Sequence, residues 1–274
     1  MSEFNTEDLY DSIPETIEEN AKPPTSEEVE SLEKAWSLDV ETLAIAEPHP
    51  DVDTYLNDSD GVYGYYATER RYGLEETILA IHEVGKVLSL RYPGRRFGVG
   101  DISKKGGGPI SGHASHQKGI DFDVRLLRKD WVESSITYHS PNYSLTLTQE
   151  LIDLFWANSN LAVQFIFFND AQTKGTRTWP NHDNHLHVRF FSPGSGQHPP
   201  ELKQNNDLLA ANHELQRRLN FWHKNLGRPG DLLIVDGIFG TKTVERLKEF
   251  QSENHVIPVN GIANNSTWKL LPLA

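Results

Sequence analysis

The pattern of apolar and polar positions predicts a chain of helices and short strands. Residues 75–92 repeat apolar side chains at helical spacing, with Ile78 and Ile81 on one stripe. A second helix is expected from Thr148, in the sequence TQELIDLFWAN. The apolar runs LAVQFIFF and HLHVRFF are rich in β-branched and aromatic residues and predict two strands. Because helices and strands do not alternate regularly, the expected fold class is α+β.

Composition divides the chain into three parts. Residues 1–60 are acidic and poor in strand-like runs, which predicts a largely disordered leader, with one possible helix at residues 25–38. The sequence SPGSGQHPP, dense in proline and glycine, ends a first domain expected over residues 61–198. A linker and a second compact domain are expected over residues 199–274.

The second domain contains an internal repeat. DGIFGTKTVERL at residues 236–247 and NGIANNSTWKLL at residues 260–271 align at a spacing of 24 residues. Each reads as a tight turn followed by a helix, and HELQRRLNFWHKNL supplies a helix before them. We therefore expect a small three-helix domain.

Charge and cysteine content exclude several classes of protein. The net charge of −13 is concentrated at the beginning, since residues 1–60 hold 18 of the 39 acidic residues and two of the 26 basic ones. The remainder is only mildly basic, which does not support nucleic-acid binding. No apolar run reaches the ~20 residues of a membrane span. With no cysteine, any metal must be held by nitrogen and oxygen ligands.

Five of the twelve histidines fall in two short segments, SGHASHQKGIDFD and WPNHDNHLHV. His185 and His187 are two apart in a predicted strand, so their imidazoles are expected on the same face. Gly119 lets the chain turn between His116 and Asp123 so that the two converge. Two imidazoles, a carboxylate and water form the open site typical of catalytic zinc. One histidine of the HLH sequence is then available as a general base.

Together, GHASHQKGIDFDV and HDNHLHV resemble the penicillin-insensitive murein endopeptidases, members of the LAS group of metallopeptidases. The resemblance covers roughly residues 62–195 and implies a small antiparallel sheet with flanking helices. It implies zinc ligands at His116, Asp123 and His187. It further implies catalytic roles for His185, the general base, and for His113 and His182, which would steer substrate or stabilise the oxyanion.

Other polar residues near these motifs remain open. Asp121 is expected to support a ligand or the fold and not to bind metal itself. Arg125 and Arg189 follow the motif strands and could bind a substrate carboxylate or form salt bridges.

The sequences LQRRL, VDGIFGTKTVERLKEFQ and NGIANNSTWKLL resemble the small peptidoglycan-binding domain of cell-wall hydrolases. The combined resemblance implies a zinc endopeptidase that cuts peptidoglycan cross-links near D-alanine and diaminopimelate, anchored on the wall by this domain. The alternatives are a D-Ala-D-Ala carboxypeptidase or dipeptidase, and a wall-binding structural protein without activity.

The family's enzymes tend to carry a signal peptide, and the N-terminal sequence here shows neither its basic nor its apolar region. We therefore expect action in the periplasm or cell wall after delivery by a phage lysis system or a specialised secretion system. A secreted antibacterial effector would have an immunity protein or a secretion-machine component as partner.

Overall fold

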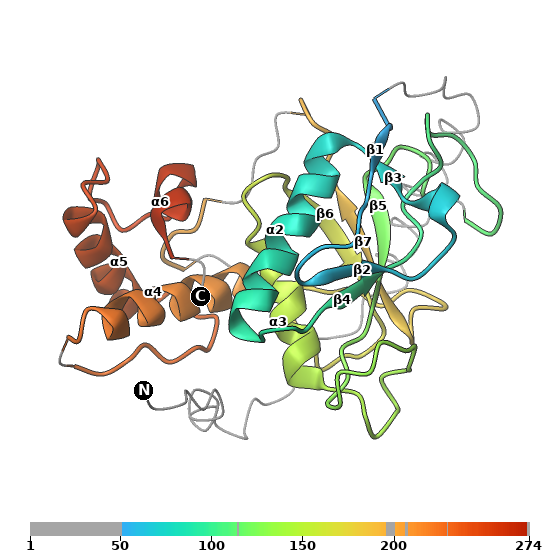
Figure 1. Ribbon diagram of the computed structural model, residues 1–274. Helices are drawn as coiled ribbons and strands as arrows, with labels where there is room; N and C mark the ends of the chain where they lie inside the picture. Colours follow the sequence, from blue (N-terminus) through green and yellow to red (C-terminus); the bar gives the residue numbers. More distant parts are fainter. Residues whose placement is uncertain (1–50, 114, 196–200, 206–207, 229, 273–274) are drawn as a thin grey trace, which may run out of the picture. The chain divides into compact units, whose positions relative to one another are not determined.

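The computed structural model describes residues 51–272, apart from residue 114 and residues 196–200, 206–207 and 229. The described residues form two compact units, one ending at residue 195 and the other starting at residue 201 (Figure 1). The acidic sequence before residue 51, including the helix considered at residues 25–38, lies outside the described residues.

The first unit includes residues that composition assigned to the leader. Thr54–Tyr55 form β1, which pairs in antiparallel orientation with β3, Tyr72–Gly73. Val52 and Leu56 are fully buried. The unit therefore starts by residue 51 and not at residue 61, because two apolar side chains anchor a segment whose average composition is acidic.

A five-stranded sheet forms the centre of the first unit. Its strands lie in the order β2-β4-β5-β7-β6, and all neighbours are antiparallel except the parallel pair β2–β4 at one edge. The strands span Val62–Gly64 (β2), Phe97–Val99 (β4), Asp121–Arg125 (β5), Val163–Phe167 (β6) and His185–Phe190 (β7). The two strands expected from apolar runs are thus confirmed as β6 and β7.

Two helices pack against this sheet (Figure 1). Helix α2 spans Glu75–Arg91, as the helical spacing predicts, and follows a short 3-10 helix, η2, at Thr68–Arg70. Helix α3 spans Leu145–Trp156 and begins three residues before the predicted start. The reason is the cap at Ser144, whose side chain accepts a hydrogen bond from the backbone N–H of Leu147.

The apolar core lies between the helices and one face of the sheet. The ring of Phe155 on α3 meets Phe97 and Phe122 edge to face, at centroid distances of 5.6 and 5.4 Å. Val124 on β5 and Val188 on β7 are fully buried on the same face. Because side chains alternate along a strand, the residues between these apolar positions point to the other face.

The second unit consists of α4 (Leu209–Asn225), α5 (Thr241–Glu253) and α6 (Asn265–Leu270). Two glutamines show that the sequence repeat is also structural. The Gln216 side chain accepts from the backbone N–H of Gly237 and donates to the Ile238 carbonyl, whereas Gln251 makes the same contacts with Gly261 and Ile262. The predicted α+β class and three-helix second domain are confirmed. Within the described part of the chain, no helix has the length and apolarity to cross a membrane.

Candidate metal centre

The polar face of the central sheet carries three pairs of facing residues on β5 and β7. In the antiparallel register the pairs are Asp121 and Arg189, Asp123 and His187, and Arg125 and His185. The Oδ1 atom of Asp123 lies 3.3 Å from His187 Nδ1 and 3.7 Å from His185 Nε2. Both imidazoles of the HLH sequence therefore share one face, as their spacing predicts.

His116 reaches this face from the loop before β5. Its side chain is fully buried, and its backbone φ is 59°, a left-handed conformation that is uncommon for a residue with a Cβ. Gly119 also has a positive φ of 68°, and a Cβ there would lie 2.9 Å from the backbone nitrogen of Leu74. Glycine is thus required at the turn that brings His116 back to Asp123.

Three possible ligand atoms lie at nearly equal separations. His116 Nε2 is 3.2 Å from His187 Nδ1 and 3.4 Å from Asp123 Oδ1, and the third side of the triangle measures 3.3 Å. Nitrogen and oxygen ligands about 2.05 Å from one tetrahedral metal ion would lie about 3.3 to 3.4 Å apart. The three separations therefore match one face of a tetrahedral site.

The electrostatics of this triangle favour a positive charge next to the Asp123 carboxylate. Burial would raise the pKa of Asp123, but His116 and His187 hold it well below its usual range. Its Oδ1 atom is buried and has no hydrogen-bond partner among the described residues. Burial would lower the pKa of His187, yet Asp121 and Asp123 raise it to about 9. A buried carboxylate oxygen without a hydrogen-bond donor fits a metal ion, so the group can hold one.

Asp121 supports the centre from behind. Its Oδ1 atom lies 3.1 Å from Nε2 of His187, the ring nitrogen that faces away from Asp123. Arg189 donates to both carboxylate oxygens of Asp121, from Nε at 2.6 Å and from Nη2 at 3.2 Å. Burial would raise the pKa of Asp121, but Arg189 and His187 lower it below its usual range. Asp121 thus orients the imidazole, and Arg189 is engaged with Asp121.

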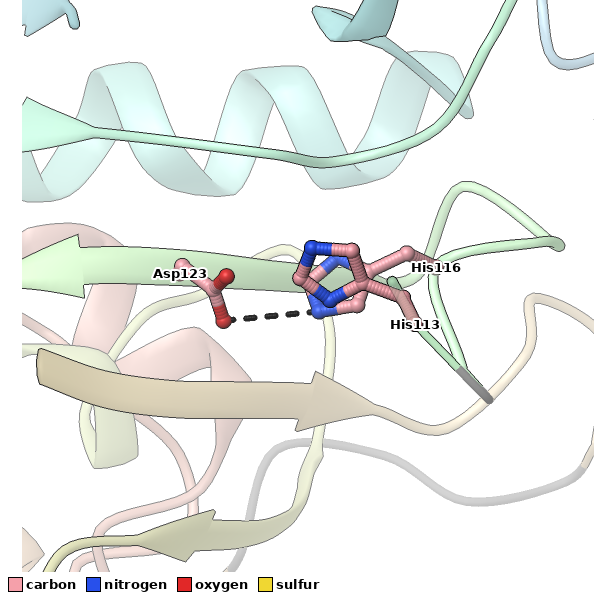
Figure 2. A group of neighbouring side chains, drawn as sticks. All are labelled: His113, His116 and Asp123. Atoms are coloured by element: carbon pink, nitrogen blue, oxygen red, sulfur yellow. Dashed lines mark ion pairs between the residues drawn. The ribbon is translucent and has the colours of Figure 1, made fainter. Parts of the chain in front are cut away.

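His113 gives a second possible set of ligands. One atom each from His113, His116 and Asp123 lies within 4.8 Å of the others, so this group too could hold a metal ion (Figure 2). His113 Nε2, however, lies 2.9 Å from Oδ2 of Asp101, an oxygen that also accepts a hydrogen bond from Arg70 at 2.9 Å. The three atoms of the set that includes His187 lie within 3.4 Å of one another.

His185 and His182 lie beside the centre and are partly exposed. Nδ1 of His185 is 2.7 Å from the Asn184 side-chain oxygen, which requires Nδ1 to donate and leaves Nε2 as an acceptor in the neutral ring. Burial lowers the pKa of His185. Nδ1 of His182 likewise faces the Pro180 carbonyl at 2.8 Å, and burial with the neighbouring histidines lowers the pKa of His182 to about 4.

Two parts of the centre were not identified from the sequence. Asp101, the partner of His113, follows β4 in GVGDIS and was not predicted as a site residue. A stack of aromatic rings borders the histidines, with Phe165 on Phe167 at 4.3 Å and Phe167 on Trp179 at 5.1 Å. The alternation of Phe165 and Phe167 along β6 was visible in the sequence, but it is equally typical of a core strand.

Comparison with known proteins matches both units. Residues 65–152 match the family of the penicillin-insensitive murein endopeptidases, and residues 211–271 match a peptidoglycan binding domain. The chain thus resembles a murein endopeptidase in its first unit and a peptidoglycan-binding domain in its second. It is 32% identical over 130 residues to a penicillin-insensitive murein endopeptidase of Haemophilus influenzae. The match covers 36% of this chain and spans 45% of the length of that relative.

The murein endopeptidase match contains the first half of the candidate centre. His113, His116 and Asp123 lie within residues 65–152, together with Asp101 and Arg125. The histidines of β7 follow the matched segment, and the sheet register brings them to the same place. The family resemblance expected from the sequence is confirmed.

Proposed function

We propose that this protein is a zinc-dependent peptidoglycan endopeptidase that hydrolyses peptide cross-links near D-alanine and diaminopimelate. The observation that carries the proposal is the triangle of His116, Asp123 and His187 on the polar face of a murein endopeptidase domain. Its separations of 3.2 to 3.4 Å suit a small ion with tetrahedral coordination.

The three residues of the triangle would hold the metal. Two imidazoles and one carboxylate, without cysteine, are a ligand set found in catalytic zinc sites, which keep one coordination position open. When bound, zinc supplies a Lewis acid that polarises a carbonyl and lowers the pKa of water to about 7. Asp121 would fix the ring of His187 by accepting a hydrogen bond from its Nε2.

In this proposal His185 transfers a proton from the attacking water to the leaving nitrogen. Its Nε2 faces the centre with a free lone pair, because Nδ1 donates to Asn184. Nε2 takes a proton from the attacking water, whose oxygen bonds to the scissile carbonyl carbon. The carbon–nitrogen bond then breaks, and the same proton passes to the leaving nitrogen, which yields an amine and a carboxylic acid. The acid then loses the second water-derived proton to solvent and becomes a carboxylate.

His113 and His182 line the site in different ways. Asp101 fixes the ring of His113 beside His116, with ring centroids 4.3 Å apart, where it can contact substrate. In its neutral form His182 has an acceptor at Nε2, because Nδ1 is used by backbone carbonyls. This suits an acceptor for a substrate N–H group better than a donor to an oxyanion.

The second unit is proposed to hold the enzyme on peptidoglycan, which raises the local concentration of cross-links. The proposed place of action is accordingly the cell wall or periplasm. A secreted antibacterial effector, with an immunity protein or a secretion-machine component as partner, and a phage lysin remain the proposed biological settings.

Digestion of purified sacculi tests the proposal. The wild-type protein is expected to convert cross-linked muropeptide dimers to monomers. The His116→Ala variant should still sediment with sacculi but should leave the dimers intact. Release of D-alanine with unchanged dimers would instead identify a carboxypeptidase. Binding without any cleavage by the wild-type protein would identify a structural wall-binding protein.

A further inference from the structure

Arg125 stands at one end of the polar face, next to the proposed proton acceptor. It lies directly opposite His185 in the sheet register, just as Asp123 lies opposite His187. Facing residues on antiparallel strands have Cβ atoms about 5 Å apart, and the next pair on the same face follows after about 6.7 Å. The half-buried Arg125 is therefore one such step from the proposed metal ligands, on the side of His185.

The guanidinium of Arg125 is held in place by neutral groups. Its Nη1 atom donates to the backbone carbonyl of Glu133 at 3.1 Å and contacts the Tyr63 hydroxyl at 3.4 Å. Its central carbon lies 3.9 Å from the ring centroid of Tyr65, a cation–π contact. Burial and the nearby Asp123 raise the pKa of Tyr65 above its usual range, so this ring stays neutral.

Two glycines give Tyr65 its position under Arg125. A Cβ at Gly100 would lie 2.6 Å from the Tyr65 hydroxyl oxygen, and one at Gly98 would lie 2.9 Å from the edge of the same ring. Only residues without a side chain leave room for the ring at these two positions on and just after β4. The support of Arg125 is therefore built into the sheet.

Arg125 also differs from the neighbouring arginines, which have acidic partners. These ion pairs are Arg70–Asp101, Arg96–Glu133 and Arg189–Asp121. Among the residues that the structure describes, no carboxylate lies within ion-pair distance of Arg125, and its buried Nε has no hydrogen-bond partner. A fixed guanidinium without a carboxylate partner suits a carboxylate ligand.

The position beside His185 indicates which part of a substrate would supply that carboxylate. On the proposed function, His185 delivers the proton to the leaving nitrogen, so this nitrogen must lie on the His185 side of the centre. A carboxylate on the carbon next to that nitrogen would then face Arg125.

We propose that Arg125 binds the free carboxylate of the amino acid whose amino group is released by hydrolysis. This inference rests on the proposed function and assigns a substrate-binding residue to it. The carboxylate belongs either to a cross-linked residue or to the C-terminal residue of an uncross-linked stem, and the two sources share the same chemistry.

The test compares pairs of soluble substrates in wild-type protein, Arg125→Gln and Arg125→Lys. One pair is a muropeptide dimer with a free or an amidated carboxylate next to the scissile nitrogen. The other is a stem peptide ending in D-Ala-D-Ala, with a free or an amidated terminus. Arg128→Gln is the matched control, because the Arg128 guanidinium is already paired with Asp130 at 2.7 Å. Thermal unfolding shows whether each variant is folded.

The wild-type protein is expected to prefer free carboxylates. The Arg125→Gln substitution should lower kcat/KM for the free acid about 10- to 100-fold while changing that for the amide little, so that the preference disappears. Arg125→Lys should retain part of the preference for the free acid, and Arg128→Gln should retain all of it. The substrate pair that shows the preference identifies the source of the carboxylate.

Equal losses on acid and amide substrates would overturn the inference, since a purely structural Arg125 affects both alike. Equilibrium binding of the same pairs in the presence of a chelator separates this question from turnover. Hydrolysis without any preference leaves the proposed function intact and removes the role of Arg125. If binding shows an Arg125-dependent preference but no substrate is hydrolysed, the role of Arg125 stands and the proposed function is contradicted.

Discussion

At the scale of single residues, the candidate centre depends most on His116. Its left-handed backbone, at φ 59°, is locally unfavourable in free energy, so contacts in the surrounding loop must offset it. Such conformations in residues other than glycine are concentrated at functional sites. The spacing of His116 and Asp123 predicted that the two converge, and the family resemblance implied that His116 is a ligand. The backbone strain could not be predicted from spacing.

Replacing His116 by alanine and by glycine separates the ligand from the strain. Both variants should lose the bound metal. Glycine should be more stable than alanine by about 1 kcal/mol, because it adopts a positive φ without a Cβ clash. Metal content after dialysis and urea unfolding measure the two effects. His113→Ala serves as the control and should retain the metal. Loss of the metal from His113→Ala would favour the ligand set that contains His113.

Asp121→Asn tests the support behind His187. The substitution removes the negative charge that orients the imidazole and pairs with the buried Arg189. Metal affinity should fall about 10- to 100-fold, and the free energy of unfolding of the metal-free protein should fall by about 3 kcal/mol. Calorimetric metal titration and urea unfolding measure these changes. The control is Asp130→Asn, at an exposed ion pair with Arg128, which should change neither the metal affinity nor the free energy of unfolding. Unchanged metal affinity in Asp121→Asn would contradict the role given to Asp121.

At the scale of elements, the antiparallel register of β5 and β7 brings the two histidine segments together. Strand alternation could be predicted for β7, since HLH places two imidazoles on one face. The pairing of Asp123 with His187 could not be derived from local sequence, because it depends on which strands are neighbours. Asp101 was missed for the same reason. It follows β4 and meets His113 only through tertiary structure.

Gly119→Ala tests the turn between His116 and β5. A Cβ there would combine a positive φ of 68° with a 2.9 Å approach to backbone, so stability should fall by about 2 kcal/mol or more and metal affinity should fall with it. Gly106→Ala is a matched control, because its φ is 78° with no atom within 4 Å of an added Cβ. Urea unfolding and metal titration compare the two. Equal effects would show that crowding at Gly119 does not matter.

At the scale of the whole molecule, the chain combines a candidate catalytic unit with a second unit whose internal repeat is visible in its sequence. The repeat could be predicted because turn and helix recur at a spacing of 24 residues. The two turns are also equivalent in structure, since Gln216 holds one and Gln251 holds the other through the same contacts. The start of the first unit was harder to predict. Val52 and Leu56 are isolated apolar residues within an acidic segment, and only their burial reveals their role.

Removal of residues 201–274 tests the division of labour. The shortened protein should bind sacculi at least about tenfold more weakly, because the second unit no longer raises the local concentration of substrate. Hydrolysis of soluble muropeptide dimers should be unchanged. Sedimentation with sacculi and dimer hydrolysis measure the two properties, with thermal unfolding as a check on folding. A matching loss of activity on soluble dimers would show that the second unit also serves catalysis.

The central claim is that His116, Asp123 and His187 would hold a metal in a site that cleaves peptidoglycan cross-links, and muropeptide analysis of digested sacculi tests it most directly. Wild-type protein should convert dimers to monomers, a chelator should stop the conversion, and stoichiometric zinc should restore it. The His116→Ala variant should remain inactive at the same zinc concentration. Full conversion of dimers in the presence of chelator, or by His116→Ala, would contradict the account.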